Sequence, residues 1–419
     1  MRSALIRLRL RMWTSGGVTA PEALDAPEET LPLRRDTTGQ IHLPGTTVVG
    51  SLRAHCEQYP SFQSTGDLPE LFGPRPGASN GQRTAPPVQV LGTLYRHRGD
   101  PELVKRTAID RVRGSAANNM LHQVEMLPAG TEFDVVLRWD DPDERFDAFL
   151  QALREWRPRL GRGASRGAGL CTVVGCGTRV YDLSAVEGLL AWLRISAPED
   201  YPEPEPVEVD TAVAPVLDLE LEIVDGLHIG AGGPAEEGST KPNINRVLRR
   251  GEDFLVPGTT LRGVLRSRVE YVCRVVSAPA CPDQSCGSCR PCRLFGFSGS
   301  SGRARRAKIA VHDSTITDPV LELRQHVAVD RFTGGARDQL LYTDEVITSG
   351  RFRVRVEELE PIDDTERLLL DAALTDLHDG LVGIGARTTA GLGTARITSP
   401  HWQRPDLTAL ADLLHEEAA

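Results

Sequence analysis

The sequence predicts an α+β protein built from two tandem domains of the ferredoxin-like, or RRM-like, kind. Two glycine-rich stretches indicate the duplication: Leu160 to Leu170 reads LGRGASRGAGL, and Ile384 to Thr394 reads IGARTTAGLGT. Other short blocks recur in both halves in the same order, which chance similarity does not produce. Each half also runs strand, loop, helix, irregular insert, strand, helix, glycine-rich loop and strand. That order suits a small antiparallel sheet backed by helices.

The composition is that of a globular protein. The chain has 419 residues, 40% hydrophobic and 25% charged, and this length suggests two or three domains. It has no apolar run of about 18 residues. Its N-terminus, MRSALIRLRLRMW, alternates apolar and basic residues like a strand rather than a signal peptide. We therefore expect a cytoplasmic protein with no membrane partner. The net charge of -10 argues mildly against a nucleic-acid partner, but the distribution of Lys and Arg matters more.

The first part of each half predicts a strand and then a helix. Residues Ala4 to Met12 alternate like a strand, and Ile41 opens IHLPGTTVVGSLRAHCE, in which a buried strand end precedes an amphipathic helix. The second half repeats this segment from Phe254 as FLVPGTTLRGVLRSRVE. We expect the paired threonines to cap free amides where each helix begins, which would make the helix N-terminus an anion site. The residues concerned are Thr46, Thr47, Thr259 and Thr260, and Arg53 aligns with Arg266.

Three further blocks occur in both halves. Leu71-Phe72-Gly73 matches Leu294-Phe295-Gly296, and Asp110-Arg111 matches Asp330-Arg331. In the glycine-rich loops, Gly161, Gly167 and Gly169 fall on Gly385, Gly391 and Gly393. Glycine accepts positive φ and lets a second backbone come close, so these loops either face a ligand or form tight turns under a packed sheet. A closing helix ends each half, at Leu183 to Ile195 and at Leu407 to Glu416.

The repeated blocks also predict the domain boundaries. They place a first domain at residues 1–196 and a second at residues 215–419. Residues 197–214 between them are rich in Pro, Glu and Asp, so we expect an extended, solvated linker.

Four cysteines in the second half have the spacing of a metal site. Between Ala280 and Phe295 the chain reads ACPDQSCGSCRPCRLF, and Cys281, Cys286, Cys289 and Cys292 could surround one tetrahedral zinc. Their insert, about residues 273–296, lacks the apolar residues for a core of its own, and a metal would replace that core. Because all four positions are Cys, none is left open for catalysis, and we expect a structural zinc. The alternatives are unrelated thiols or a redox pair, and Cys273 could replace one ligand.

The order of these motifs resembles that of the RAMP superfamily of CRISPR proteins. Pro-Gly-Thr-Thr-x-x-Gly-x-x-Arg, Leu-Phe-Gly, Asp-Arg-x-x-Gly and a glycine-rich loop are similar to the backbone subunits of type III effector complexes. The second half is the closer match. It has Cys-x-x-Cys-Arg-Leu-Phe-Gly and then VDRFTGGAR, from Val329 to Arg337, which looks like the family's thumb hairpin. The first half has IDRVRGSA there, from Ile109 to Ala116, and lacks the cysteines.

This resemblance implies a role in antiviral RNA recognition. In the family each copy binds about six nucleotides of CRISPR RNA by contacting the backbone of the RNA. The copies stack on one another and on other type III effector subunits. Phosphate contacts of this kind are blind to sequence. The hairpins at Asp110, Arg111, Asp330 and Arg331 would wedge between bases and kink the duplex of CRISPR RNA and target RNA. The implied RNA-binding residues, besides the four threonines, are Arg53, Gly161, Arg162, Gly163, Arg166, Gly167, Gly169, Arg262, Arg266, Gly385, Arg387, Gly391 and Gly393.

The family also ties cleavage of target RNA to an Asp in the loop before the Pro-Gly motif, a few residues ahead of an Arg-Asp or Lys-Asp pair. Arg35-Asp36 match that pair in the first copy, which puts Thr30 near the expected place, after Asp25, Glu28 and Glu29. Ile244 or Asn245 falls there in the second copy. A carboxylate can assist the attack of a 2′-hydroxyl, so any endoribonuclease activity is expected in the first copy only. The alternative for the three acids is a solvated loop.

Three other functions are compatible with the sequence. A guide-processing endoribonuclease of the same superfamily would need a base near the first helix, and His42, His55 and His228 are available but not evidently grouped. A nucleotide-binding enzyme could use the glycine loops as phosphate cradles, but neither loop has the Gly-Lys-Ser/Thr or Gly-x-Gly-x-x-Gly order. The third is a non-catalytic scaffold stabilised by zinc. Without an RNA role, it would lack the steep salt dependence of phosphate contacts.

Overall fold

The chain folds into two compact units. The computed structural model describes residues 1–20, 30–62, 67–73, 85–96, 100–109, 116–163, 167–208, 215–231, 244–281, 286–298, 304–408 and 410–416. The first unit comprises Met1–Val104, His122–Ala164 and Ala168–Ala212, and the second comprises Lys105–Leu121, Ser165–Gly167 and Val213–Ala419. The main division, after Ala212, falls inside the Pro- and acid-rich segment between the two halves of the sequence. Both units mix helices with sheet, so the α+β class is confirmed.

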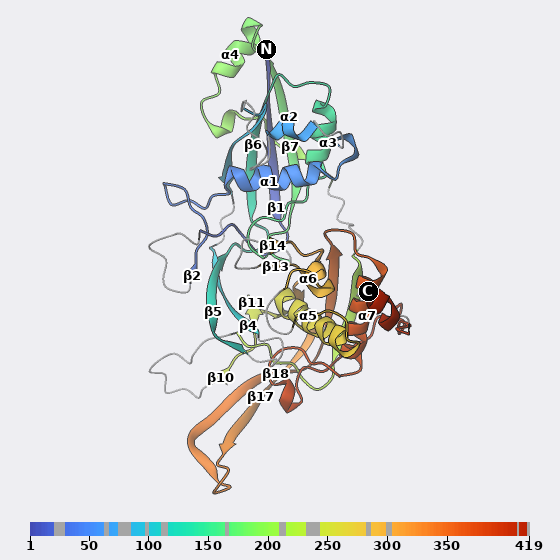
Figure 1. Cartoon of the computed structure of the whole chain (residues 1–419). Coiled ribbons are helices and arrows are strands. Elements are labelled where there is room, and N and C mark those ends of the chain that lie inside the picture. The colour runs from blue at the N-terminus through green and yellow to red at the C-terminus, as the bar shows by residue number, and fades with distance from the viewer. Residues whose placement is uncertain are drawn as a thin grey trace. The chain divides into compact units, whose positions relative to one another are not determined.

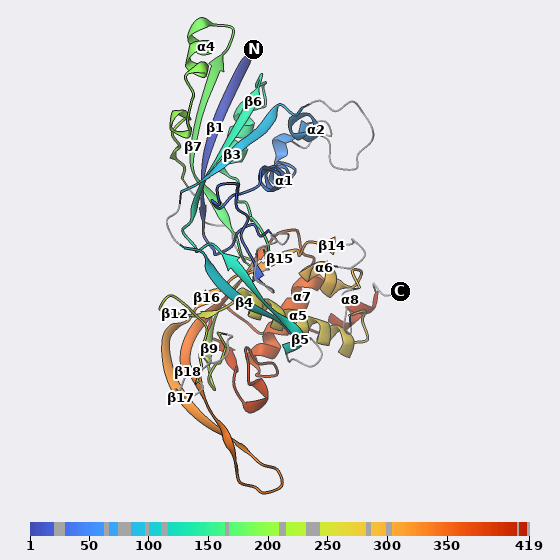
Figure 2. The same ribbon diagram turned by 90° about the vertical axis from the view of Figure 1, so that its left-hand side faces the viewer.

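An antiparallel sheet forms the centre of the first unit. Its strands are β1 (Arg2–Met12), β3 (Val88–Tyr95), β6 (Glu132–Asp140), β7 (Cys171–Asp182) and β8 (Glu205–Pro206), in the order β3-β6-β1-β7-β8. Alternate side chains of β1 point to opposite faces, and Ile6, Leu8 and Leu10 lie in the core. The same core includes residues of α1 (Gly45–Cys56) and α3 (Phe146–Arg154). Helix α1 lies against this face of the sheet (Figures 1 and 2).

The other face of this sheet is charged, and residues 198–207 lie along it. Arg7 of β1 is 1% exposed, and its Nη2 lies 2.6 Å from Oδ2 of Asp134 on β6. Nη1 of Arg7 donates to the carbonyl of Pro198 at 3.2 Å, and Arg9 binds Glu203 at 3.2 Å. Strand β8 pairs with β7 in the same segment. The predicted linker is therefore not solvated throughout, because its first half is held by strand pairing and by two arginines of β1.

The second unit repeats the central arrangement. Strand β9 (Leu217–Ile223) lies between β18 (Ala336–Glu358) and β19 (Ala395–Ile397), as β1 lies between β6 and β7, and these ladders are antiparallel. Strand β15 (Ile309–Val311) pairs with the C-terminal end of β18, in the position that β3 has beside β6. Leu219 and Phe352 belong to a core shared with α5 (Gly258–Val275) and α7 (Asp364–His378).

Matching pairs outside the central sheets also reflect the duplication. Strand β2 (Thr30–Leu31) pairs in parallel with β5 (Ala116–Met126), and β10 (Ile244–Asn245) pairs in parallel with β18. Gly16 forms an antiparallel bridge with Leu127, and Leu227 forms one with Ile347. The first bridge lies just before β6, and the second lies within β18, just before the part of that strand that pairs with β9. The repeat in the sequence is thus visible in the backbone pairing of both units.

Short elements complete the described chain. They are α2 (Asp67–Phe72), α6 (Arg290–Phe295), β11 (Arg249–Arg250), β12 (Asp253–Val256), β13 (Phe297–Ser298), β14 (Ala304–Arg305) and β16 (Ser314–Thr315), with 3-10 turns at Pro60–Phe62, Pro198–Asp200 and Thr388–Ala390. Helices α2 and α6 each end in the Leu-Phe of a Leu-Phe-Gly block, so this block marks the C-terminus of a one-turn helix in both copies.

A long hairpin extends from the second unit (Figures 1 and 2). Strand β17 (Thr317–Val329) pairs with the N-terminal part of β18, from Thr317 opposite Arg351 to Val329 opposite Ala336. Several of its apolar side chains are exposed, including Leu323 at 56% and Phe332, in the terminal turn, at 99%. In the first copy, β4 (Glu102–Ile109) and β5 form the corresponding strands, in a sheet with β2.

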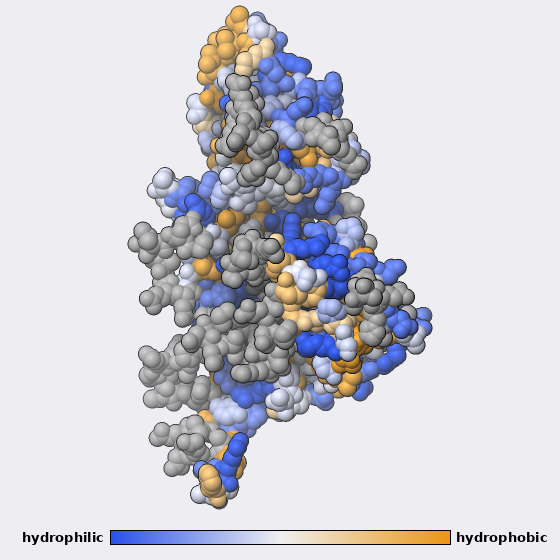
Figure 3. Space-filling model, viewed as in Figure 1, coloured by the Kyte–Doolittle hydropathy of each residue, from blue (hydrophilic) through white to orange (hydrophobic). Residues whose placement is uncertain are grey.

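The two predicted closing helices differ in their environment. Helix α8 (Leu410–Glu416) buries Leu410 and Leu414 in the core of the second unit. Helix α4 (Val186–Leu193) buries none of its residues, although seven of the eight are not charged. Val186 and Leu193 are each 67% exposed. Figure 3 shows the resulting apolar surface over α4, at the top of that view. A surface of this kind on a single chain indicates an interaction site.

Candidate functional site

The two glycine-rich loops are closed by the same backbone hydrogen bonds. The amide of Leu160 donates to the carbonyl of Gly169 at 2.8 Å, and the amide of Ile384 donates to that of Gly393 at 2.9 Å. The amide of Gly169 donates to Ser15 at 3.0 Å, and that of Gly393 to Gly226 at 2.7 Å. Each loop is therefore fixed to the chain that follows the first strand of its own copy.

Four glycines of these loops are required by close contact with the backbone of their own copy. All four have positive φ, and a Cβ at any of them would collide with a carbonyl oxygen. A Cβ on Gly161 would lie 1.8 Å from the carbonyl oxygen of Gly17, and one on Gly169 would lie 2.1 Å from that of Leu160. A Cβ on Gly385 would lie 2.5 Å from the carbonyl oxygen of His228, and one on Gly393 would lie 2.3 Å from that of Ile384. These four glycines therefore have the tight-turn role, whatever else the loops do.

Two other loop residues, Arg162 and Gly391, are exposed. Gly391 is exposed, and a Cβ there would meet no atom within 4 Å. A Cβ at Gly163 would meet only the Ala168 side chain, at 3.4 Å, and Arg162 beside it is exposed. Gly167 is buried with a φ of +76°, and Arg166 lies outside the described residues. The surface that a ligand could reach is thus formed near Arg162 in one loop and Gly391 in the other.

Arg387 is held inside its own copy. It has a φ of 60°, the left-handed conformation that glycine has at the equivalent Gly163. Its Nε lies 2.6 Å from Oδ2 of Asp344, a fully buried carboxylate of β18, and its guanidinium lies over the ring of Tyr342 at 4.9 Å. The ring of His326 stacks on the same tyrosine, Tyr342, with 5.1 Å between the ring centroids. Arg387 therefore connects the glycine loop to the base of the long hairpin.

Arg53 and Arg266, which the motif alignment pairs, make the same internal bond. Nη1 of Arg53 donates to the carbonyl of Gly73, and Nη1 of Arg266 donates to that of Gly296, both at 2.8 Å. These glycines end the two Leu-Phe-Gly blocks. Arg262 likewise donates to the carbonyl of Phe295. The arginines thus fix the turn after the short helix, and their contact with RNA stays a prediction.

The threonines of the Pro-Gly-Thr-Thr motif do not cap their helices. Both helices begin at the glycine, with Pro44 and Pro257 as N-cap residues that make no side-chain capping bond. The threonines, Thr46, Thr47, Thr259 and Thr260, therefore lie within the first turn. Proline at the cap explains the difference, because its fixed φ directs the chain into the helix two residues earlier than a cap at Thr46 or Thr259 would. At α5 the amide of Gly258 donates to Oδ1 of Asp313 at 2.8 Å, so a carboxylate already occupies this helix start.

The turn of the long hairpin is organised by Asp330. Its Oδ1 accepts from the amides of Phe332 and Thr333, each at 2.9 Å, and these bonds lower the pKa of the Asp330 carboxyl. The turn leaves Arg331 and Phe332 exposed. Asp330 therefore has the role common for Asp in turns, which is to accept hydrogen bonds from turn amides. The turn that it fixes displays the aromatic ring of Phe332 at the tip. Asp110 and Arg111 lie outside the described residues.

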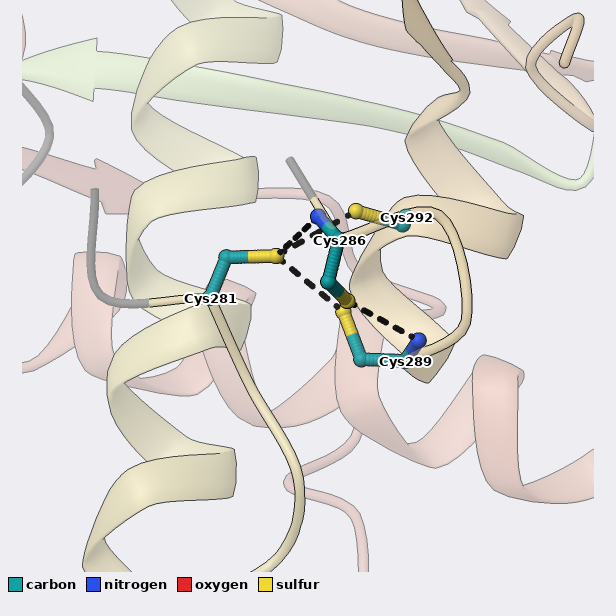
Figure 4. A group of neighbouring side chains, drawn as sticks. All are labelled: Cys281, Cys286, Cys289 and Cys292. Carbon is teal, nitrogen blue, oxygen red and sulfur yellow. Dashed lines mark hydrogen bonds between the residues drawn. The ribbon is translucent and has the colours of Figure 1, made fainter. Parts of the chain in front are cut away.

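The four cysteines converge, as Figure 4 shows. Sγ of Cys281 lies 3.5 Å from Sγ of Cys289 and 3.4 Å from Sγ of Cys292, and all four sulfurs lie within 4.8 Å of one another. Sulfurs about 2.3 Å from one zinc would stand roughly 3.8 Å apart in a tetrahedron, so the set fits this ion. Cys286 is exposed and the other three are buried. Cys273 packs in the main core instead and is not a member of this group.

Amides and a hydroxyl point at these sulfurs. The amide of Cys286 donates to Sγ of Cys281 at 3.0 Å, and that of Cys289 donates to Sγ of Cys286 at 3.3 Å. Burial opposes ionisation of Cys286, but the bonds from Ser288 and Cys289 outweigh it and lower the pKa of this thiol to about 6. Burial raises the pKa of Cys281 to about 11. A bound cation would be needed to hold all four as thiolates at neutral pH.

Comparison with protein families identifies the repeated unit. The family described as the RAMP superfamily matches residues 10–172 and 220–396. The chain belongs to the RAMP superfamily. The two matched regions follow one another along the sequence, so the chain carries two RAMP copies. The superfamily is in general one of CRISPR-associated RNA-binding proteins. No curated protein matches the chain. Among the described residues, no helix combines the length and apolar character needed to cross a bilayer.

A glutamate that the motif analysis missed holds the same segment in both RAMP copies. Glu125 accepts from the amide of Leu33 at 2.7 Å and from Arg35 at 2.6 Å. Glu345 accepts from the amide of Val247 at 3.0 Å and from Arg249 at 3.2 Å. The sequence did contain a signal, because LHQVEMLPAG and LYTDEVITSG align with this Glu at the same place. Each glutamate thus fixes the segment that runs from the position expected for a cleaving carboxylate to the Pro-Gly motif.

The position expected for a cleaving carboxylate is occupied differently in each copy. In the second RAMP copy, strand β10 consists of Ile244 and Asn245, and Nδ2 of Asn245 donates to Oδ1 of Asp344 at 2.6 Å. The matching strand of the first copy begins at Thr30. The predicted catalytic residues Asp25, Glu28 and Glu29 precede it and lie outside the described residues.

Proposed function

We propose that this protein is a CRISPR-RNA-binding backbone subunit of a type III antiviral ribonucleoprotein, with two fused copies of the gripping unit. The observation that supports it most is the matched construction of the two RAMP copies. Both keep the glycine loop, the Pro-Gly-Thr-Thr helix and the Leu-Phe-Gly turn, and the second displays a hairpin with an exposed tip. A protein that holds one guide in repeating steps needs such repetition.

Each copy is ferredoxin-like in this proposal. Counting only the strands of the repeat, the first copy has the sheet order β3-β6-β1-β7, and the second has β15-β18-β9-β19. Numbered along each copy, both correspond to strands two, three, one and four. This order, with a helix after the first and third strands, supports the split βαβ plan.

The guide would lie along residues that the structure leaves accessible. Arg162 and Gly391 are exposed in the two glycine loops, and Thr46 is exposed in the first turn of α1. An arginine can bind phosphate through a charge-assisted bond, and an open glycine lets the backbone amides come close to it. Contacts of this kind carry no sequence information, which suits a protein that must accept any guide.

The long hairpin would insert between bases. Phe332 is 99% exposed in a turn that Asp330 rigidifies, and an exposed aromatic ring can stack on any base. The hairpin would thereby kink the guide–target duplex at about six-nucleotide steps, the spacing that the family resemblance implies, and unstacking a base step costs a few kcal/mol.

The cysteine group would hold a structural zinc, which supplies cross-links between chain segments rather than chemistry. Cys281 follows α5, and Cys292 lies in α6. Arg290, beside Cys289, also binds the N-cap residue of α7, Asp363, at 2.8 Å. Replacing Cys286 and Cys289 with Ser should release about one zinc per chain, measured by elemental analysis of the purified protein. Pure native protein without a metal would contradict this part.

Neighbouring subunits would be the protein partners. The exposed apolar surface of α4 supports this, because the matching helix of the second copy is buried in its own core. Target-RNA cleavage, if present, would use a carboxylate among Asp25, Glu28 and Glu29 in the first copy, since β10 of the second copy contains none.

One experiment tests the central proposal. The full chain is expressed with a CRISPR array, purified at moderate salt, and its bound RNA is sequenced. We expect short RNAs of defined length that begin in the repeat and continue into a spacer. Random cellular RNA, or none, would contradict the guide-binding role. A matched target RNA is then added to the native protein and to a variant in which Asp25, Glu28 and Glu29 are Ala, and loss of cuts at regular steps would assign the carboxylate.

A further inference from the structure

The arginine of the second Pro-Gly-Thr-Thr motif makes a contact that its counterpart in the first copy does not share. Arg266 is 9% exposed on α5. Its Nε donates to Glu270 at 2.9 Å, its Nη1 to the carbonyl of Gly296 at 2.8 Å, and its Nη2 to Sγ of Cys292 at 3.6 Å. One guanidinium thus joins helix α5, the Leu-Phe-Gly turn and the cysteine group.

The first copy provides an internal comparison. Arg53 has a glutamate four residues later, Glu57, at 3.7 Å, and it makes the matching bond to Gly73. The residue that aligns with Cys292 is Pro69, the third residue of α2 as Cys292 is the third of α6. The arginine can therefore position the Leu-Phe-Gly turn without any thiolate. In the second copy Arg266 positions the same turn and also contacts Sγ of Cys292.

Electrostatics explains what the contact between Arg266 and Cys292 would do. Four thiolates around one divalent cation leave a net charge of −2, and three of these cysteines are buried. A buried anionic group needs donors, and a hydrogen bond from a cation is stronger than one from a neutral group. A donor held beside a metal ligand fixes the orientation of that ligand. The guanidinium of Arg266 is oriented by Glu270 and Gly296 before any metal is bound.

We propose that Arg266 is a positioning residue of the metal site, and that through it metal binding is coupled to the RNA-facing helix α5. This inference rests on the proposed metal. The guanidinium donates to Cys292 when the site is loaded and so holds α5 and the Leu-Phe-Gly turn in one arrangement. Loss of metal lets the side chain of Cys292 turn away and removes one of the bonds that fix the arginine. Coupling is reciprocal, so loosening the arginine weakens metal binding.

The test compares Arg266→Met with Arg53→Met in the full chain. Both remove the bond to a Leu-Phe-Gly carbonyl, so both should destabilise their own unit. Zinc affinity is measured by competition with a chromophoric chelator, and cobalt absorption reports thiolate coordination. We expect Arg266→Met to weaken zinc binding about 10- to 100-fold and Arg53→Met to leave it unchanged. Arg266→Lys, which keeps the charge but lacks the planar fork whose three nitrogens reach Glu270, Gly296 and Cys292 at once, should fall between them.

Hydrogen exchange supplies the second readout. On chelation of zinc from the native protein, amide exchange should rise in 258–266 of α5 and not in 45–53 of α1. Native-like zinc affinity in folded Arg266→Met or Arg266→Lys would overturn the inference while leaving the metal site intact. A native protein that binds no zinc would overturn both. If Arg266→Met does not fold, Arg266→Lys alone decides the question, because an affinity equal to native contradicts a positioning role.

Discussion

Replacing Gly393 with Ala should unfold the second RAMP copy far more readily than the same change two residues earlier, at Gly391. Both glycines have left-handed φ, +93° and +87°, so both variants carry the cost of placing an L-residue there. They differ in what the new Cβ meets. At Gly393 it would lie 2.3 Å from the carbonyl oxygen of Ile384, whereas at Gly391 it would meet nothing within 4 Å.

The size of the difference follows from these contacts. The left-handed conformation costs an Ala roughly 1–2 kcal/mol at either position. At Gly393 the backbone must also move by about 1 Å, which strains the bond from Ile384 and the bond to Gly226, each worth about 1 kcal/mol. Overpacking adds about 1–3 kcal/mol. We therefore expect Gly393→Ala to cost roughly 3–5 kcal/mol, which is 2–3 kcal/mol more than Gly391→Ala.

Hydrogen exchange in increasing urea measures this without separating the two units. Amides of α7 report on the second copy, and amides of α3 serve as the control in the first. With a slope of about 1–3 kcal/mol per molar urea, α7 of Gly393→Ala should lose protection about 1–2 M earlier than α7 of Gly391→Ala. Equal protection in the two variants would refute the view that Gly393 is required by packing. Gly391→Phe should keep α7 protected but weaken guide retention, and unchanged retention would count against the loop as a guide contact.

Three further predictions follow from single contacts. Arg7→Met should destabilise the first unit by about 3 kcal/mol in urea unfolding, because Asp134 stays buried with less compensation, and the added change Asp134→Leu should recover much of this loss. Although partial burial opposes ionisation, bonds from the Glu366 amide and Arg290 lower the pKa of Asp363. Its contribution is therefore present above the unfolded pKa near 3.9 and is lost as pH falls through the lower folded pKa. Because Asn caps a helix about as well as Asp, Asp363→Asn should lose mainly the ion pair with Arg290, up to about 1 kcal/mol near pH 7 and little below pH 3, which unfolding at both pH values checks. Phe332→Ala should leave stability unchanged but reduce the fluorescence rise of a 2-aminopurine placed at the expected kink, and an unchanged signal would rule out the wedge.

The motif analysis treated the glycines of each loop as one set, whereas the structure divides them into packed glycines and open ones. The sequence predicted one set of glycines facing RNA, with tight turns as the alternative. Four of them, including Gly385 and Gly393, touch a backbone carbonyl so closely that no side chain fits, while Gly391 is open. The pattern of glycine is the same in both cases. Which glycine touches which strand depends on residues far away in the chain, such as Gly17 and His228.

The arginines show the same limit. Alignment of the copies paired Arg53 with Arg266, and the family resemblance implied RNA contact for both. The structure adds why the Pro-Gly-Thr-Thr motif and the Leu-Phe-Gly motif occur together, since the arginine of one binds the last carbonyl of the other. Arg387, also assigned to phosphate, binds the buried carboxylate of Asp344. No spacing rule could identify Asp344, because it approaches through the pairing of β10 and β18.

By itself the sequence determined the α+β class, the duplication, the superfamily and the cysteine group. These rest on periodicity, on order along the chain and on short spacings, and a short spacing keeps residues such as Cys289 and Cys292 close in any compact fold. Only the tertiary structure decided which glycines are packed, which arginines are internally bound and how 198–207 is held against the first sheet. The physical reason is that a donor goes to whichever acceptor the packed strands and helices bring within about 3 Å, and that choice is made by long-range pairing rather than by neighbours in sequence.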